Sequence, residues 1–233
     1  MQVVDFHAHI LPEMDDGSKN VQMSIEMLNR MREQGVDTVV ATPHFYGHRE
    51  SVSRFLNRRR VSYEKLCAEC SEDLPNIMLG AEVAFFSGLS ELEDLNKLCV
   101  EDTDVLLVEM PFAPWTGYEY DAIVSLCLDR HLRVVLVHYE RFAKMQLNNT
   151  YYEKILRLPV KIQISAESLL PVLKRQRWLN MFRDGTAQLL GSDCHNLSNR
   201  APNLGIARGV VKKKLGERVL DEIDRQSLDL LNH

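Results

Sequence analysis

The chain has 233 residues, of which 45% are hydrophobic and 26% charged, and its formal net charge is −5. This length suits one α/β barrel, so we predict a single domain over residues 1–233. The negative charge argues against a nucleic-acid-binding protein, and no run reaches the roughly 20 apolar residues of a membrane span. The chain starts without a secretory signal, and its five cysteines form no regular framework, so we expect a cytoplasmic protein with reduced thiols.

Seven short apolar runs, rich in Val, Leu and Ile, predict strands buried on both faces of a parallel sheet. The runs are 3–4, 38–42, 77–79, 105–108, 134–137, 160–162 and 188–190. Apolar residues at helical spacing lie between them. They predict helices from a Ser18 N-cap to Gly35, over 53 to about 72, over 121–130, over 168–180, and over 204–231 with a break near Gly216. Strands that alternate with helices predict an α/β fold, a distorted (β/α)7 TIM-like barrel.

Polar residues follow the apolar runs in step. They are Asp5, His7 and His9, then His44, Glu82, Glu109, His138, Gln163, Asp193 and His195. The carboxyl ends of barrel strands converge on the face that carries active sites. His7 and His9 lie two residues apart in an extended segment, so both can hold one ion, and Asp15-Asp16-Gly17 can add a carboxylate. Clustered imidazoles and carboxylates without thiolate predict a multi-metal hydrolase that uses Mn, Fe or Zn.

A series of motifs carries a resemblance to a known family. Asp5-x-His7-x-His9 with Asp15-Asp16-Gly17 resembles the opening motif of the PHP (polymerase and histidinol phosphatase) superfamily. The later motifs are Thr42-Pro43-His44, Gly80-Ala81-Glu82, Val108-Glu109-Met110-Pro111, His138-Tyr139-Glu140-Arg141, Gln163-Ile164-Ser165-Ala166 and Ser192-Asp193-Cys194-His195-Asn196. Together they are similar to the bacterial PHP-type protein-tyrosine phosphatases encoded with capsule and exopolysaccharide genes. The resemblance covers about residues 3 to 205.

The resemblance implies a PHP-type barrel and a metal-dependent phosphotyrosine phosphatase with nine metal ligands. They are His7, His9, Asp16, His44, Glu82, Glu109, His138, Asp193 and His195. It also implies that Arg141 and Arg200 contact phosphate, and that three divalent ions bind, usually manganese. The implied partner is the tyrosine-rich tail of a bacterial tyrosine autokinase that controls polysaccharide export, and some relatives form oligomers. The family usually has Pro where Tyr139 stands and Ala where Cys194 stands, which puts substrate preference in doubt.

The expected reaction is direct hydrolysis of a phosphate monoester. Five neutral imidazoles and four carboxylates would be negative alone, and three divalent cations would make the site positive. Metals lower the pKa of a bound water from about 15.7 toward 7, which gives hydroxide for in-line attack on phosphorus. Arg141 and Arg200 would hold the equatorial oxygens. A tyrosine phenol, with a pKa near 10, leaves far more easily than a serine alkoxide.

Other functions fit parts of the pattern. A small-molecule phosphatase such as histidinol-phosphate phosphatase would use the same chemistry. A PHP phosphodiesterase or exonuclease would need a basic track, which the net charge of −5 disfavours. A metal-binding regulatory module without catalysis would bind manganese or a phosphopeptide without turnover.

Thiol chemistry is a further alternative. Cys194 and Arg200 have the C-x5-R spacing of cysteine-dependent phosphatases, as do Cys127 and Arg133, but no Gly follows Cys194 within that spacing. Cys67 and Cys70 form an isolated C-x-x-C within the predicted second helix, where core or boundary positions are expected.

Several other side chains have both a structural and a functional interpretation. The basic runs 58–60 and 212–214 are interpreted as solvated helix faces. His48, Phe112 and Trp115 lie in loops after predicted strands. They are candidates for substrate contact, or they cap the barrel.

Overall fold

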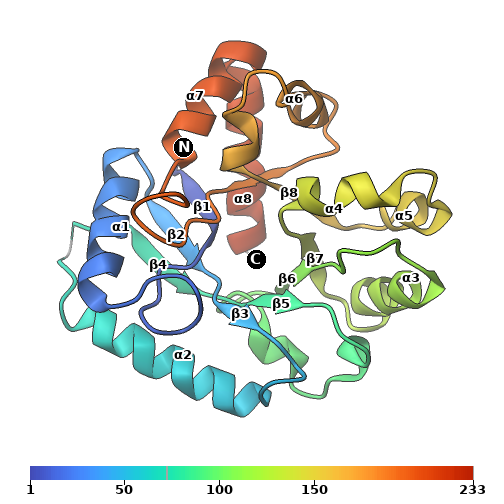
Figure 1. Cartoon of the computed structure of the whole chain (residues 1–233), viewed down its shortest axis with the longest axis horizontal. Coiled ribbons are helices and arrows are strands. Elements are labelled where there is room, and N and C mark those ends of the chain that lie inside the picture. Colours follow the sequence, from blue (N-terminus) through green and yellow to red (C-terminus); the bar gives the residue numbers. More distant parts are fainter. Residues whose placement is uncertain (72, 233) are drawn as a thin grey trace.

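The computed structural model of the protein describes residues 1–71 and 73–232. Parallel strands form the centre of the fold, and helices surround them (Figure 1). The strands are β1 (Val4–Ala8), β2 (Thr38–Ala41), β3 (His44–Phe45), β4 (Asn76–Leu79), β5 (Glu82–Ala84), β6 (Val105–Glu109), β7 (Arg133–Leu136), β8 (Lys161–Ser165) and β9 (Leu189–Gly191). All seven predicted runs form strands. β3 and β5 were not predicted.

The sheet curls until its last strand returns to its first. β1, β2 and β4 pair in that order, and the second ladder runs β3-β5-β6-β7-β8-β9. β3 follows β2 after two residues, and β5 follows β4 after two, so the two ladders continue one another along the chain. A parallel bridge joins Ala8 to Cys194, and the His9 amide donates to the Cys194 carbonyl at 2.9 Å. The predicted distorted parallel barrel is confirmed.

Helices cover the outside of the curled sheet. They are α1 (Val21–Glu33), α2 (Val52–Cys67), α3 (Gly117–Val124), α4 (Tyr139–Phe142), α5 (Thr150–Ile155), α6 (Gln176–Arg183), α7 (Leu204–Leu215) and α8 (Glu217–Leu231). Short 3-10 and π-helical turns extend several of them. Within the described residues, no helix is both long and apolar enough to cross a membrane.

Two predicted helices near the N-terminus are confirmed with different ends. The N-cap of α1 is Asn20, whose side chain accepts the Met23 amide, so the predicted Ser18 cap is wrong. Gly35 follows the helix with φ +79°, as the stop signal predicts. The prediction for α2 extended to about Glu72, which lies outside the described residues, whereas the helix ends at Cys67.

The later helices show how local signals decide helix ends. α3 begins at Gly117, before the predicted 121, because Thr116 and Glu119 form a capping box. The prediction of one helix over 168–180 is wrong. Pro171 interrupts it, and α6 starts only at Gln176. The break between α7 and α8 at Gly216 is confirmed.

Alternation along the strands separates two apolar clusters. On β6, Val105 and Leu107 join a small cluster shared with other strands, whereas Leu106 and Val108 join the large cluster that includes the helices. Side chains from strands around a closed sheet fill its inside. Glu109 has the same parity as Leu107, so it stands at the carboxyl end of the inner face.

Candidate metal centre

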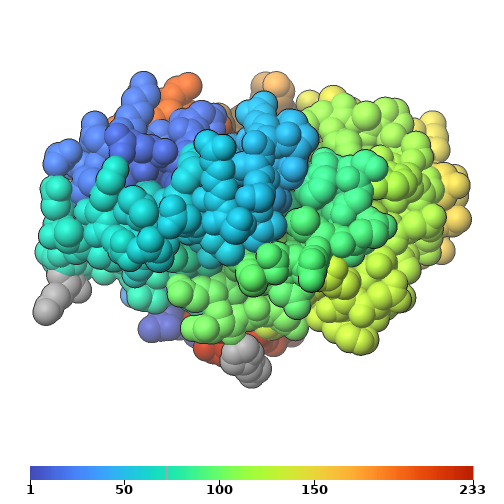
Figure 2. Space-filling model, turned by 90° about the horizontal axis from the view of Figure 1, so that it is seen from below, coloured from blue at the N-terminus to red at the C-terminus, as the bar shows by residue number. Residues whose placement is uncertain are grey.

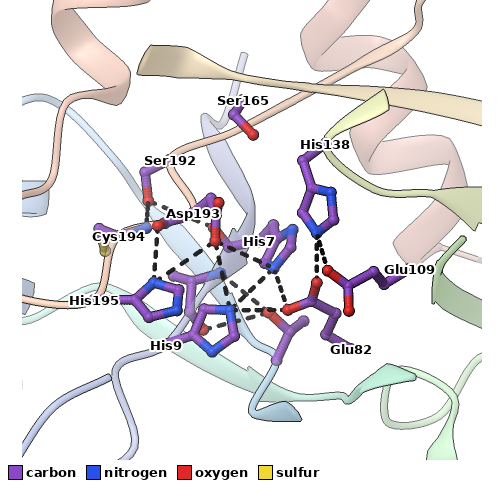
Figure 3. Close-up of polar contacts among 12 residues, drawn as sticks. His7, His9, Glu82, Glu109, His138, Ser165, Ser192, Asp193, Cys194 and His195 are labelled. Atoms are coloured by element: carbon purple, nitrogen blue, oxygen red, sulfur yellow. Dashed lines mark hydrogen bonds and ion pairs between the residues drawn. The ribbon is translucent and has the colours of Figure 1, made fainter. Parts of the chain in front are cut away.

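The nine residues that the motifs single out as ligands lie together at the carboxyl ends of the strands. Figure 3 shows the imidazoles of His7, His9, His138 and His195 turned toward the carboxylates of Glu82, Glu109 and Asp193. Most of this centre is buried, and Asp16 is its most exposed member, at 67% of its side chain. Residues separated by almost the whole chain meet here because parallel strands end on one face.

Glu82 is the hub of the group. Its Oε2 atom lies 3.2 Å from Nε2 of His7 and 3.1 Å from Nε2 of His9. Its Oε1 atom lies 2.6 Å from Nε2 of His138, and Oε2 is 3.0 Å from Nδ1 of His44. Glu82 begins β5, a strand that the sequence pattern missed, and is fully buried. One carboxylate therefore joins four imidazoles, two from the end of β1, one from β3 and one that follows β7.

The remaining carboxylates extend the group in two directions. On one side, Glu109 Oε1 lies 3.4 Å from Nε2 of His138. On the other side, Asp16 Oδ1 lies 3.3 Å from Nε2 of His44 and 3.5 Å from Nε2 of His195. The structure therefore joins all these predicted ligands to the Glu82 hub.

Asp193 brings both predicted phosphate-binding arginines into the site. Its Oδ1 atom lies 3.7 Å from Nε2 of His7 and 2.9 Å from Nη2 of Arg200, and its Oδ2 atom pairs with Arg141. Arg141 is on α4, and Arg200 is in the loop after β9. The backbone of Asp193 has φ +51° and that of His138 φ +33°, a region that residues other than Gly rarely adopt. Such backbone strain clusters at functional sites.

A second layer of polar groups orients the imidazoles. Asp15 Oδ2 accepts from Nδ1 of His9 at 2.8 Å and from the His44 amide at 2.9 Å. Gln163 Oε1 accepts the His138 amide at 2.6 Å and lies 3.4 Å from Nδ1 of His7. These contacts engage the Nδ1 atoms, so the Nε2 atoms of His7 and His9 point toward Glu82. Spacing alone left open which carboxylate of the Asp15-Asp16 pair serves the site, whereas the resemblance implies Asp16.

Asp5 has a different role from the histidines that follow it. Its Oδ1 atom accepts the Ser192 amide at 2.8 Å and the His7 amide at 3.4 Å, and Oδ2 has no hydrogen-bond partner within the described part of the chain. Burial raises the pKa of Asp5 to about 6. Asp5 therefore ties β1 to the segment that carries Asp193.

Charge in the centre is tightly balanced. Burial alone would raise the pKa of Glu82, but His7 and His138 hold it well below its usual range. Burial would also raise the pKa of Asp193, but neighbours led by His7 lower it to about 2. Burial, and then the Glu82 carboxylate, raise the pKa of Glu109 to about 7. Ionised carboxylates at this depth require cations beside them.

The donor atoms fit divalent metal ions. Nε2 of His7, Nε2 of His9 and Oε2 of Glu82 are 3.1–3.2 Å apart. Ligand distances of about 2.0–2.2 Å place neighbouring donors about 2.8–3.1 Å apart in octahedral geometry and about 3.3–3.6 Å apart in tetrahedral geometry. Further groups with donor atoms within 4.8 Å of one another are His9-His44-His195, Asp15-Asp16-His44 and His44-Glu82-Glu109. The nitrogen and oxygen donors suit Mn, Fe or Zn.

Thiol catalysis does not fit this geometry. Cys194 is fully buried, and burial, followed by the Asp5 carboxylate, raises the pKa of its thiol well above the ordinary value. The amides of His195 and Asn196 both donate to the Arg200 carbonyl, so they are not free to surround a phosphate. In the other C-x5-R pair, Cys127 and Arg133, the arginine begins β7. The metal ligand His138 follows the opposite end of that strand, so Arg133 lies away from the centre.

Of the two aromatic residues after β6, Phe112 lies where it can contact substrate and Trp115 caps the barrel. Trp115 is buried, with its ring centroid 5.2 Å from Phe142, so it caps the barrel. Phe112 is 48% exposed and stacks near His138 at a centroid distance of 6.3 Å, which leaves it at the mouth of the site. Tyr139 is buried against Tyr152 and does not line the mouth.

Gly191 allows a close approach of backbone and side chains within the centre. A Cβ atom at this position would lie 2.7 Å from Cβ of His7 and 2.9 Å from Nε2 of Gln163. Gly191→Ala is therefore expected to destabilise the protein by about 1–3 kcal/mol and to weaken metal binding. Urea unfolding would measure the first effect. Gly209→Ala on α7 is the control, because a Cβ atom there would meet nothing within 4 Å. Alanine in a helix should raise the free energy of unfolding by up to about 1 kcal/mol relative to glycine. Equal stability of the two variants would contradict the argument.

Asp15 is expected to affect metal affinity indirectly, because it orients the imidazole ring of His9. Asp15→Asn replaces the acceptor of the His9 Nδ1 hydrogen bond, so the affinity for Mn²⁺ is expected to fall by about 10- to 100-fold. Calorimetric titration of the metal-free protein would measure the change. Asp94→Asn, at an exposed pair with Lys97, should leave the affinity unaltered. An unaltered affinity in Asp15→Asn would exclude this orienting role.

The curled parallel sheet, with imidazoles and carboxylates at its strand ends, defines a barrel of the metal-dependent hydrolase class. Comparison with known families is more specific. Residues 3–229 match the family described as capsular polysaccharide synthesis, CpsB/CapC. The chain belongs to the CpsB/CapC family, and the resemblance to PHP-type capsule phosphatases is confirmed.

Individual relatives align along nearly the whole chain. The chain is 28% identical to tyrosine-protein phosphatase YwqE of Bacillus subtilis, covering 93% of this chain and 87% of that protein. It is 26% identical to tyrosine-protein phosphatase CpsB of Streptococcus pneumoniae, covering 95% and 94%.

Solved structures show the same fold. A crystal structure from work on YwqE of B. subtilis and CpsB of S. pneumoniae, described as unique metal-dependent tyrosine phosphatases, superposes with a TM-score of 0.78 at 24% identity. It covers 99% of this chain and 95% of that chain. The phosphotriesterase homology protein of Escherichia coli superposes with a TM-score of 0.57 at 12% identity, covering 99% of both chains.

Proposed function

We propose that this protein is a metal-dependent protein-tyrosine phosphatase of the CpsB/CapC type that acts in capsular or exopolysaccharide synthesis. The observation that carries the proposal is the gathering of five imidazoles and three further carboxylates around Glu82 in a chain that matches this family over residues 3–229. The whole of residues 1–233 acts as one phosphatase domain.

The metal ligands are the nine residues that the motifs single out. They are His7, His9, Asp16, His44, Glu82, Glu109, His138, Asp193 and His195. We propose three divalent ions, with manganese preferred and iron or zinc as alternatives. When bound, these ions would acidify a water molecule and neutralise phosphate charge.

The protein's own groups bind and orient the phosphate. Arg141 and Arg200 reach the same carboxylate, Asp193, from two separate segments, so both guanidinium groups can donate to one phosphate dianion. Asp15 and Gln163 hold the histidine rings in the orientation that leaves Nε2 toward the centre. In the reaction, water oxygen bonds to phosphorus, the bond from phosphorus to the tyrosine oxygen breaks, and a proton from water ends on the phenol.

Features at the mouth favour an aryl phosphate. A phenol is a good leaving group at neutral pH, so the site needs no strong general acid. Phe112, exposed beside His138, offers an aromatic face to the tyrosine ring.

The partner is a phosphotyrosine protein, and we propose the tail of a bacterial tyrosine autokinase. All five cysteines are unpaired, which supports a reducing, cytoplasmic setting. Neither nucleic acid nor a membrane is required for the reaction.

Substrate preference tests the proposal. Hydrolysis of a phosphotyrosine peptide with Mn²⁺ should exceed that of the matched phosphoserine peptide and of histidinol phosphate. A preference for histidinol phosphate would identify a small-molecule phosphatase with the same chemistry. Manganese or phosphopeptide binding without turnover of any substrate would identify a regulatory module.

A further inference from the structure

A cavity opens directly beside the metal centre. Its volume is about 540 Å³, and it shares Asp16 and His44 with the centre. Its other walls come from the loop after β3 and from the first turns of α2, including Tyr46, Arg49 and Arg54. α2 crosses the lower edge of Figure 1, and its residues face the viewer in the central part of Figure 2.

Most acidic groups of this cavity already have partners. Glu50 pairs with Arg58 at 2.6 Å, and Arg58 also donates to the Met14 carbonyl. Asp15 accepts from His9 and from two backbone amides. Asp16 lies between His44 and His195. Among the arginines of the cavity, these acidic side chains therefore form an ion pair with Arg58 only, within the described residues.

Arg49 and Arg54 remain available. Both are exposed, and no carboxylate of the described chain lies within 4.0 Å of either guanidinium group. The Arg49 guanidinium stands 4.5 Å from the ring centroid of Tyr46, which restrains it. The Tyr46 ring is in turn 5.4 Å from that of His44. A cationic wall thus continues directly from the metal centre.

We infer that this cavity binds an anionic side chain of the substrate, a carboxylate or a phosphate, close to the phosphotyrosine. The inference rests on the proposed function. With the phosphotyrosine phosphate at Arg141 and Arg200, residues one to three positions away in an extended peptide lie within about 3–11 Å along the chain. Arg49 and Arg54 then select peptides with acidic neighbours, because guanidinium groups bind carboxylates and phosphates bidentately.

Three matched phosphotyrosine peptides test the inference. The residues flanking the phosphotyrosine are Glu in the first, Gln in the second and phosphoserine in the third. The wild-type protein with Mn²⁺ should favour the Glu peptide over the Gln peptide by about 5- to 10-fold in kcat/KM. This ratio should fall as ionic strength rises. A higher kcat/KM for the phosphoserine peptide than for the Glu peptide would show that the cavity prefers phosphate to carboxylate.

Variants connect the preference to the cavity. In the double variant Arg49→Gln/Arg54→Gln, the ratio between the Glu and Gln peptides should fall to about one. Arg60→Gln, on the same helix but paired with Glu64 outside the cavity, should keep the wild-type ratio. Equal kcat/KM for the Glu and Gln peptides in the wild type, or a ratio retained in the double variant, would overturn the inference. Failure to hydrolyse any phosphotyrosine peptide would instead overturn the proposed function, and this inference with it.

Discussion

Glu82→Gln is expected to reduce phosphotyrosine hydrolysis by at least about 10³-fold, because several kcal/mol of metal-derived stabilisation are lost at about 1.4 kcal/mol per tenfold. Glu82 is the only described residue whose carboxylate contacts His7, His9, His44 and His138 together. Glutamine has the same shape but no charge, so it is a poor ligand for divalent ions. Steady-state kinetics and bound-metal analysis would measure both losses.

The control for this variant is Glu64→Gln, which changes an exposed glutamate on α2 whose one ion pair among residues 1–71 and 73–232 is with Arg60. Activity and metal content should stay at the wild-type level. Circular dichroism would confirm that both variants are folded. A Glu82→Gln protein that keeps a tenth of the activity would remove Glu82 from the centre of the mechanism.

Arg141→Lys and Arg200→Lys are each expected to lower kcat/KM by about 10²- to 10³-fold with little change in metal content. Lysine keeps the charge but cannot donate bidentately to phosphate. The effect therefore differs from that of Glu82→Gln, in which metal and activity are lost together. Inhibition by inorganic phosphate should weaken in parallel with kcat/KM.

Arg133→Lys provides the matched control, because Arg133 pairs with Asp104 at the opposite end of β7. It also belongs to the second C-x5-R pair, so unchanged activity would speak against a thiol site there. If Arg141→Lys and Arg200→Lys retained full kcat/KM, the two arginines would have a structural role at Asp193 only.

The fold and most of the centre could be predicted because they depend on repeated local signals. Each apolar run marks a strand, and the polar residue that follows it falls on the face where strand ends converge. Glu109 and His138 are adjacent in space for this reason alone, although 29 positions separate them. Two strand segments, β3 and β5, were missed because they have only two and three residues and each starts with a polar residue, His44 or Glu82.

Other features depend on contacts that no local pattern encodes. Ser18 and Asn20 are both good N-cap residues, and the buried contact of Ser18 with Ser24 decides between them. Spacing leaves a similar choice within the Asp15-Asp16 pair. In the structure Asp15 accepts from Nδ1 of His9, whereas Asp16 Oδ1 lies 3.3 Å from Nε2 of His44. The run 58–60 was interpreted as a solvated face, but Arg58 lines the cavity beside the centre.

The most direct test of the account is phosphotyrosine hydrolysis with and without metal in three proteins: the wild type, Cys194→Ala and Asp193→Ala. We predict that a chelator abolishes wild-type activity and Mn²⁺ restores it, that Cys194→Ala remains active, and that Asp193→Ala does not. Activity that persists in chelator and is lost in Cys194→Ala would contradict the metal-dependent mechanism.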